Sequence, residues 1–172
     1  FSPAADWSPW NNTTQTAFVD LTHAFANGWQ LHAMASHRQT DADSALFYVY
    51  GWPNRATGEG ITPYAYKSFQ RGSQNNLDLY LSGPFSAFGR DHEWVVGLTG
   101  SQYRTDYFDD PHGDLPDVGN YFDWNGQYPY PDFASSSERV SIARTRQSGA
   151  YAAARLSLAD PLKLVIGARY AR

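Results

Sequence analysis

The feature that most constrains this fold is a two-residue alternation of apolar and polar side chains that persists over unusually long segments. In the clearest segment, Leu77, Leu79 and Leu81 alternate with polar or amphipathic residues. Successive side chains of a β-strand point to opposite faces of its sheet, so this pattern predicts strands with one apolar face. Six segments show it, at residues 14–25, 29–39, 75–83, 92–103, 146–158 and from Leu162 onward.

The connections between the six predicted strands alternate in length. Short turns join the first strand to the second, the third to the fourth and the fifth to the sixth, whereas long segments at about 41–73 and 104–141 make the other two connections. Compact soluble domains seldom contain two loops of that length, whereas outer-membrane barrels combine short periplasmic turns with long extracellular loops. The predicted strands also approach or exceed the roughly 9–11 residues that a tilted membrane-spanning strand needs.

The short turns have local signals of their own. Phe25 and Trp29 both belong to apolar rows, so an odd number of residues must separate them, and Ala26-Asn27-Gly28 supplies three. Gly28 suits the left-handed position of such a turn. Short turns are also predicted at 84–91 and 159–161. Aromatic residues beside these turns, including Trp94, are typical of an interfacial girdle.

Composition excludes several classes of protein. The chain of 172 residues has no cysteine, which rules out disulfide scaffolds and thiolate chemistry. Its net charge of −4 and its scattered Lys and Arg argue against a nucleic-acid partner. The sequence contains no zincin, nucleophile-elbow or phosphate-loop motif and its five histidines lack ligand spacing, so neither an enzyme nor a cofactor is predicted.

The two long connections hold more than half of the aromatic residues. Loops are normally polar, so these rings are expected to pack against each other, a partner or a ligand. The predicted ligand-binding residues are Tyr48, Tyr50, Trp52, Arg55, Tyr64 and Tyr66 in the first loop and Trp124, Tyr128 and Tyr130 in the second. Packing of the loops on themselves is the alternative for each ring. The second loop is also rich in Asp, for which a solvated acidic loop is favoured over a calcium site.

Several stretches together resemble the barrel of TonB-dependent ferric-siderophore receptors. They are residues 6–10 (DWSPW), 25–29 (FANGW), 77–85 (LDLYLSGPF) and 149–162 (GAYAAARLSLADPL). The likeness extends over nearly the whole chain and is greatest to the hydroxamate-type branch, such as the coprogen/rhodotorulic acid and ferripyoverdine receptors. No one of these stretches is decisive alone.

The resemblance implies an all-β fold, in which residues 1–172 form an antiparallel up-and-down transmembrane β-barrel segment of about six strands. The complete barrel of the family has about 22 strands and an N-terminal plug, which is not in this chain. The chain is therefore expected to be a fragment of a longer protein.

The same resemblance implies transport and not catalysis. The partners are then a ferric siderophore, outer-membrane lipid and TonB, which acts through the plug region. Iron enters only as the siderophore complex, and the location is the Gram-negative outer membrane. Two other classes fit the residues as well: a soluble carbohydrate-binding β-sandwich with exposed Tyr and Trp, and a porin or adhesin barrel without TonB coupling.

Overall fold

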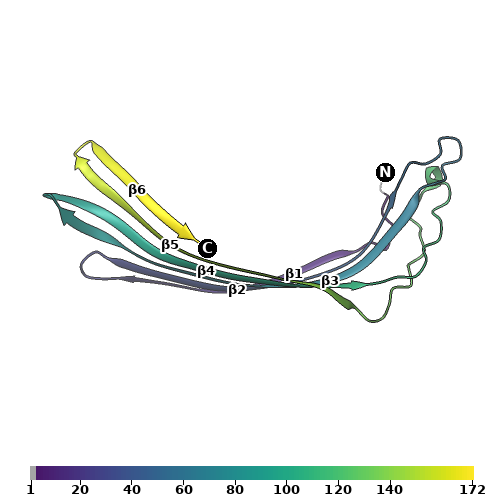
Figure 1. Cartoon of the computed structure of the whole chain (residues 1–172), viewed down its shortest axis with the longest axis horizontal. Helices are drawn as coiled ribbons and strands as arrows, with labels where there is room; N and C mark the ends of the chain where they lie inside the picture. Colours follow the sequence, from purple (N-terminus) through teal and green to yellow (C-terminus); the bar gives the residue numbers. More distant parts are fainter. Residues whose placement is uncertain (1–2) are drawn as a thin grey trace. The chain divides into compact units, whose positions relative to one another are not determined.

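The computed structural model describes residues 3–172 as one six-stranded sheet in the order β1-β2-β3-β4-β5-β6 (Figure 1). Each strand lies beside its neighbours in the sequence, which is the antiparallel up-and-down arrangement predicted. The strands are β1 (Trp10–Ala24), β2 (Gln30–Tyr50), β3 (Thr62–Ala87), β4 (Arg90–Asp110), β5 (Glu138–Ala159) and β6 (Leu162–Ala171). A single 3-10 turn, η1 (Tyr121–Asp123), lies between β4 and β5. No helix within residues 3–172 is long and apolar enough to span a membrane.

The strands are much longer than the sequence pattern predicted. β2 continues to Tyr50 and β3 begins at Thr62, so the connection is residues 51–61 and the predicted boundaries 41–73 were too wide. β4 likewise continues to Asp110 and β5 begins at Glu138, which shortens the predicted 104–141 to residues 111–137. Alternation fails there because both faces of the added segments carry aromatic or polar residues, so periodicity alone does not reveal a strand.

The short turns also differ from prediction in part. The first is as predicted: the Phe25 N–H donates to the Trp29 carbonyl at 2.8 Å, and Gly28 has a φ of 84°. The turn between β3 and β4 contains only Phe88 and Gly89, both with positive φ, instead of residues 84–91. The turn between β5 and β6 contains two residues, because β5 includes Ala159.

The residues divide into two compact units. The "barrel unit" comprises Gln15–Gln39, Ser73–Arg104 and Ala143–Arg172, and the "loop unit" comprises the described residues up to Thr14 with Thr40–Gly72 and Thr105–Ile142. Each unit is described by itself below.

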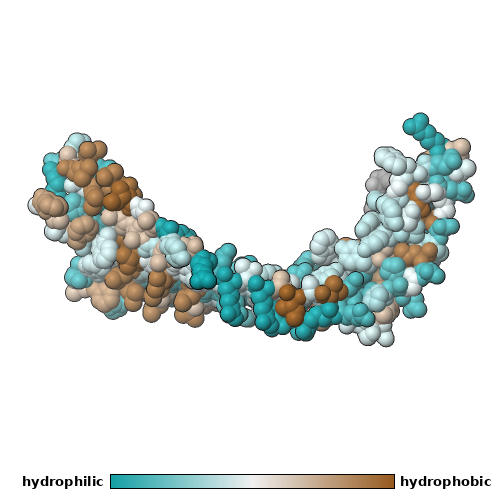
Figure 2. Space-filling view, viewed as in Figure 1, coloured by the Kyte–Doolittle hydropathy of each residue, from teal (hydrophilic) through white to brown (hydrophobic). Residues whose placement is uncertain are grey.

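One face of the barrel unit is apolar and uncovered. The side chains of Leu77, Leu98 and Ile166 are 55%, 57% and 51% exposed, so within residues 3–172 neither a second sheet nor a helix lies over them. Figure 2 shows hydrophobic side chains gathered over this unit, near the turn between β5 and β6. An exposed apolar face of this kind suits contact with lipid, and the single sheet of the described residues gives no support to the sandwich alternative.

Aromatic residues mark the end of this face near the short turns. The Trp29 and Trp94 rings meet edge to face with their centroids 5.2 Å apart. Gly83 makes the contact possible, because a Cβ there would overlap the Trp29 ring. Tryptophan pairs at this position are typical of a membrane interface, as predicted for Trp29 and Trp94.

The other face of the barrel unit is polar. His32 makes a 3.0 Å contact with the Asp20 carboxylate and stacks on Tyr80 at 4.7 Å. Arg155 pairs with Glu93 at 3.2 Å. These polar side chains alternate with the apolar row, as expected for strands with one wet face.

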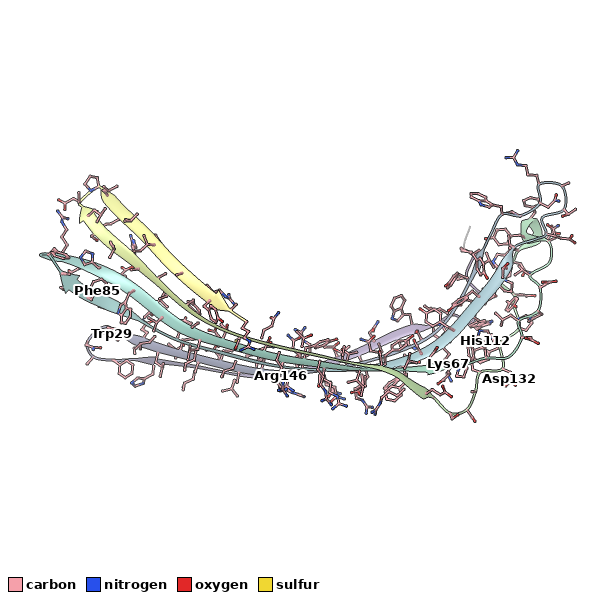
Figure 3. The ribbon with its side chains drawn as sticks, viewed as in Figure 1. Trp29, Lys67, Phe85, His112, Asp132 and Arg146 are labelled. Atoms are coloured by element: carbon pink, nitrogen blue, oxygen red, sulfur yellow. The ribbon has the colours of Figure 1, made fainter. Side chains whose placement is uncertain are left out.

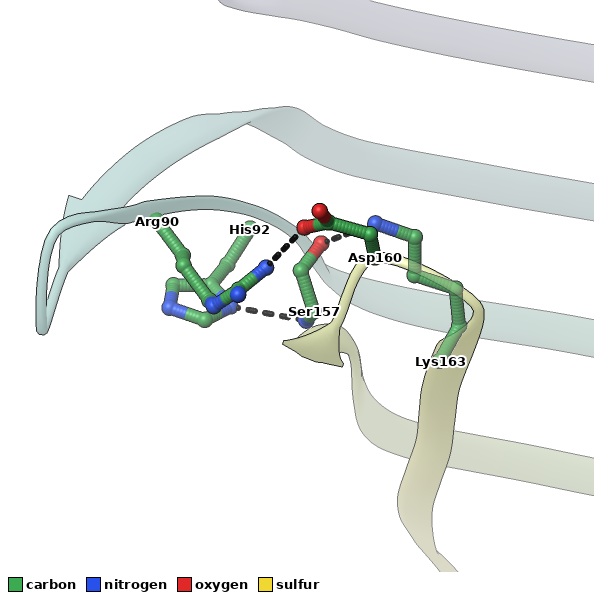
Figure 4. Close-up of polar contacts among 5 residues, drawn as sticks. All are labelled: Arg90, His92, Ser157, Asp160 and Lys163. Atoms are coloured by element: carbon green, nitrogen blue, oxygen red, sulfur yellow. Dashed lines mark hydrogen bonds and ion pairs between the residues drawn. The ribbon is translucent and has the colours of Figure 1, made fainter.

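Polar contacts hold the turn between β5 and β6 against β4 (Figure 4). Arg90 pairs with Asp160 at 2.8 Å, and the Lys163 ammonium donates to the Ser157 hydroxyl at 2.7 Å. The Ser157 backbone N–H donates to Nδ1 of His92 at 3.0 Å, beside a register shift between Ser157 and Ala159. The histidine therefore supplies an acceptor where the bulge interrupts the ladder.

Candidate ligand-binding site

All nine predicted binding residues lie in the loop unit, but the structure places them in three different environments. Some are in its hydrophobic core, some form a tyrosine cluster on a strand face, and some lie at a loop tip. The environment decides which of them can meet a ligand.

The core of the loop unit is built around Phe47 of β2. Its ring is 3% exposed and lies 4.2 Å from the Tyr128 ring and 5.6 Å from the Trp124 ring, with which it stacks. Trp7 makes an edge contact with Phe47 at 5.9 Å and donates its indole N–H to the Tyr128 carbonyl at 2.7 Å. The segment before β1 and the connection after β4 thus cover the same face of the strands.

Backbone and side-chain hydrogen bonds hold the segment before β1 and the connection after β4 on this face. The Asp6 N–H donates to the Gly126 carbonyl at 2.9 Å, and the Ala45 N–H donates to the Pro9 carbonyl at 3.1 Å. The Tyr128 hydroxyl donates to the Pro116 carbonyl. Burial raises the pKa of the Tyr128 phenol, with a further contribution from the carboxylate of Asp117, so it remains a donor at neutral pH.

Ion pairs secure the same covered face. Lys67, labelled on β3 in Figure 3, lies 2.8 Å from Asp110, and Arg139 lies 3.8 Å from Asp106. Burial alone would raise the pKa of Asp110, but the hydrogen bonds from Lys67 and Ser137, together with the Lys67 charge, lower it. The hydrogen bond to Asp110 raises the pKa of Lys67 and outweighs the effect of burial. Both groups therefore stay charged at neutral pH.

A "tyrosine cluster" of Tyr48, Tyr64, Tyr66 and Tyr107 lies on strands β2, β3 and β4. The Tyr48 and Tyr64 rings are 4.8 Å apart, and Tyr64 is 6.1 Å from Tyr66. Tyr48 and Tyr64 are 43% and 42% exposed. Burial raises the pKa of the Tyr66 phenol, and the phenols of Tyr107, Tyr48 and Tyr64 and the Asp109 carboxylate raise it further.

The cluster has the chemistry of a stacking surface with hydrogen-bonding edges. Adjacent phenol rings offer rigid area for a planar ligand group, and protonated hydroxyls can donate to its oxygens. The ring of Tyr48 belongs to this surface, whereas that of its neighbour Phe47 is buried in the core, because successive side chains of a strand point to opposite faces.

The loop tip between β2 and β3 carries the remaining first-loop residues. Trp52 is 92% exposed and Arg55 is also exposed, so both can contact a bound molecule. The Ala56 N–H donates to the Asn54 side chain and the Gly58 N–H to the Asn54 carbonyl, both at distances of 2.8 Å or less. These bonds order the tip and fix the position from which Trp52 projects.

The structure divides the predicted binding residues between the tyrosine cluster, the loop tip and the core. The structure brings Tyr48, Tyr64 and Tyr66 together on one surface, with Tyr50 exposed at the end of β2. It separates the second-loop residues from this surface: Tyr128 is buried in the core, Trp124 packs on Phe47, and Tyr130, which is 56% exposed, meets Trp7 at 5.1 Å. For Trp124 and Tyr128 the geometry is that of the self-packing alternative.

Sequence reasoning missed Tyr107 and Asp109 as members of the site. Both lie in the predicted long loop 104–141, although they alternate with Phe108 and Asp110 as strand residues do. Extending the alternation of β4 past Tyr103 would have placed them on one face. No group of three or more His, Asp or Glu side chains within residues 3–172 is arranged to hold a metal ion.

Comparison with known proteins defines the class. The family model for the TonB dependent receptor-like β-barrel matches residues 1–172, so the chain belongs to the TonB-dependent receptor family. This family comprises receptors of the Gram-negative outer membrane and not enzymes, which fixes the location of the chain.

The chain is similar in sequence to receptors for ferric pyoverdines. The chain is 33% identical over 174 residues to the ferripyoverdine receptor of Pseudomonas aeruginosa, and 34% identical over 177 residues to the ferric-pyoverdine BN7/BN8 receptor of Pseudomonas putida. These alignments cover 98% and 96% of this chain and 21% of each relative. The chain therefore spans about a fifth of the length of these relatives.

The structure is similar to solved receptors. The outer-membrane ferripyoverdine receptor of P. aeruginosa bound to ferripyoverdine has a TM-score of 0.89 at 31% identity, covering 99% of this chain and 23% of that one. The ferric-catecholate import receptor Fiu of Escherichia coli has a TM-score of 0.69 at 16% identity, which is a likeness of fold alone.

Proposed function

We propose that this chain is the part of an outer-membrane receptor that helps bind a ferric siderophore of the pyoverdine class for uptake driven through TonB. The observation that carries the proposal is the tyrosine cluster, which forms a stacking surface in a chain related to ferripyoverdine receptors.

The covered and uncovered faces of the loop unit support this assignment. Residues near Trp7 and Trp124 cover the face that carries Phe47, which leaves the tyrosine cluster on the other face. Tyr48 and Tyr50 are two residues apart on β2, so both side chains lie on the uncovered face of the loop unit.

The size and chemistry of a ferric siderophore match such a surface. The chelate is bulky and partly apolar, so ring contacts supply area while Tyr hydroxyls can meet its polar groups. The exposure of Trp52 and Arg55 at the loop tip supports a role for both in contact with the chelate. Coupling to TonB is assigned to the plug region of the complete receptor.

The test uses the full-length receptor and ferripyoverdine. Replacing both Tyr48 and Tyr64 with Ala is expected to weaken binding by about 1–3 kcal/mol, read as the Kd from quenching of intrinsic fluorescence. The corresponding Phe replacements keep the rings and separate stacking from hydrogen bonding. Phe122→Ala is the matched control, because that ring is 59% exposed in the same unit but outside the cluster.

The results test separately whether the tyrosine cluster contacts the ligand and whether the ligand is a ferripyoverdine. An unchanged Kd for the folded double Ala variant refutes the cluster as the contact surface. Failure of the wild-type receptor to import iron from ferripyoverdine, in cells without another pyoverdine receptor, refutes the assignment of ligand class.

A further inference from the structure

A second candidate site lies in the barrel unit, where its apolar face ends. The paired positions of β5 and β6 on this face are apolar over four successive register steps: Leu156 with Leu164, Ala154 with Ile166, Ala152 with Ala168 and Ala150 with Tyr170. The next pair on the same face is Ser148 with Arg172, which exchange two backbone hydrogen bonds of 2.9 Å. Tyr170 is 73% exposed at this boundary, as expected of an interfacial aromatic residue.

The length of β6 matches that of a strand that crosses a bilayer. Leu162 begins β6 beside the short turn, and Tyr170 lies eight residues further along the strand. A tilted strand of about 9–11 residues crosses the hydrocarbon core. Arg172 and its neighbours therefore lie at the level of the lipid headgroups, at the end of the barrel unit opposite the short turns.

A hollow of about 590 Å³ opens at that level. Polar groups from β3, β4, β5 and the residue that follows β6 surround it, namely those of Asn75, Gln102, Arg146, Ser148 and Arg172. Gly100 lies in its lining, and the space above this glycine is open, because a Cβ there would meet no atom within 4 Å. The hollow therefore exists because β4 carries no side chain at this point.

Two guanidinium groups give the hollow its charge. Arg146, marked on β5 in Figure 3, and Arg172 are both exposed, and neither has an ion-pair partner within residues 3–172. By contrast, Arg71, Arg90, Arg139 and Arg155 each pair with a carboxylate. Unpaired arginines beside an apolar surface are suited to an anionic group that arrives with the lipid.

We infer that this hollow binds the phosphate of a phosphorylated lipid in the outer leaflet. Guanidinium groups bind phosphate oxygens through paired hydrogen bonds, and the amides of Asn75 and Gln102 and the Ser148 hydroxyl offer further donors. The acyl chains of the same lipid would lie along the adjoining exposed row that includes Leu77 and Leu98. Short turns face the periplasm in such barrels, so the opposite end meets the outer leaflet.

The experiment uses the full-length receptor in detergent, titrated with bis-phosphorylated lipid A and followed by native mass spectrometry. The double variant R146Q/R172Q is expected to lower lipid occupancy at least tenfold. The matched control R38Q/R169Q removes the same charge from β2 and β6 at positions outside the hollow. It is expected to retain wild-type occupancy.

Two further titrations of the wild-type receptor test whether the phosphate must belong to a lipid, and neither depends on the folding of a variant. Dephosphorylated lipid A is expected to bind the wild-type receptor at least tenfold more weakly, which tests the phosphate without any mutation. Inorganic phosphate at millimolar concentration is expected to leave lipid A bound, because it lacks the acyl chains. Equal binding of the dephosphorylated lipid, displacement by inorganic phosphate, or wild-type occupancy in a folded R146Q/R172Q receptor would each overturn the inference.

Discussion

Replacement of Phe47 by Ala tests whether its ring holds residues 111–137 against the strands of the loop unit. The ring is 3% exposed and contacts three aromatic side chains, at centroid distances of 4.2, 5.6 and 5.9 Å. Truncating a buried Phe to Ala costs about 3–5 kcal/mol, because transfer energy is lost and a cavity remains. Since 1.4 kcal/mol is a factor of ten, local opening should become at least about 100-fold more frequent.

Hydrogen exchange of the full-length receptor, followed by mass spectrometry, measures this opening. Amides of residues 111–137 should exchange at least about 100-fold faster in the Phe47→Ala variant, whereas those of β6 should keep their wild-type rates. Tyr48→Ala is the matched control, because it removes the adjacent but 43% exposed ring, and a change of about 1 kcal/mol or less is expected. Unaltered exchange at 111–137, or equal acceleration in β6, would refute the reasoning.

The remaining predictions concern an ion pair and a close contact. Because its native pKa is lowered, Asp110 stabilises the loop unit above its ordinary pKa of 3.8, and this contribution is lost as the pH falls through the native value. Lys67→Met should therefore reduce the loss of protection at residues 111–137 on acidification below about pH 4, and an unchanged acid profile would contradict the assigned pair. In the barrel unit, a Cβ at Gly97 would overlap the Tyr151 ring, so Gly97→Ala should destabilise by about 1–3 kcal/mol. In a Tyr151→Ala background the same change should cost less than about 0.5 kcal/mol, and an equal cost in both backgrounds, measured by urea unfolding, would exclude the contact.

Much of the fold could be predicted from local pattern. The alternation in residues 75–83 and 146–158 identified strands, and parity between Phe25 and Trp29 gave the first turn correctly. These features are predictable because the period of a strand and the left-handed preference of Gly28 are properties of a few adjacent residues.

The strand extensions could not be predicted in the same way. From Thr40 to Tyr50, aromatic and apolar residues occur on both faces, since one face packs in the core and the other carries the tyrosine cluster. A strand covered on one side and aromatic on the other has no apolar–polar alternation to detect. The predicted loops were too long for this reason.

The candidate site was predictable as a region but not residue by residue. An excess of Tyr and Trp in residues 41–73 and 104–141 indicated where rings gather. Composition could not distinguish Tyr128, which is buried, from Tyr64, which is 42% exposed. That distinction depends on Trp7 and Trp124, which reach Phe47 from distant parts of the chain.

By itself the sequence determined the class of this protein: alternation, turn chemistry and the stretches shared with siderophore receptors define a membrane β-barrel segment, because each depends on residues close together in the chain. Only the tertiary structure decided which rings form a core and which form a surface, and which arginines lack a partner. Those outcomes depend on contacts between strands far apart in the sequence, and no local pattern records them.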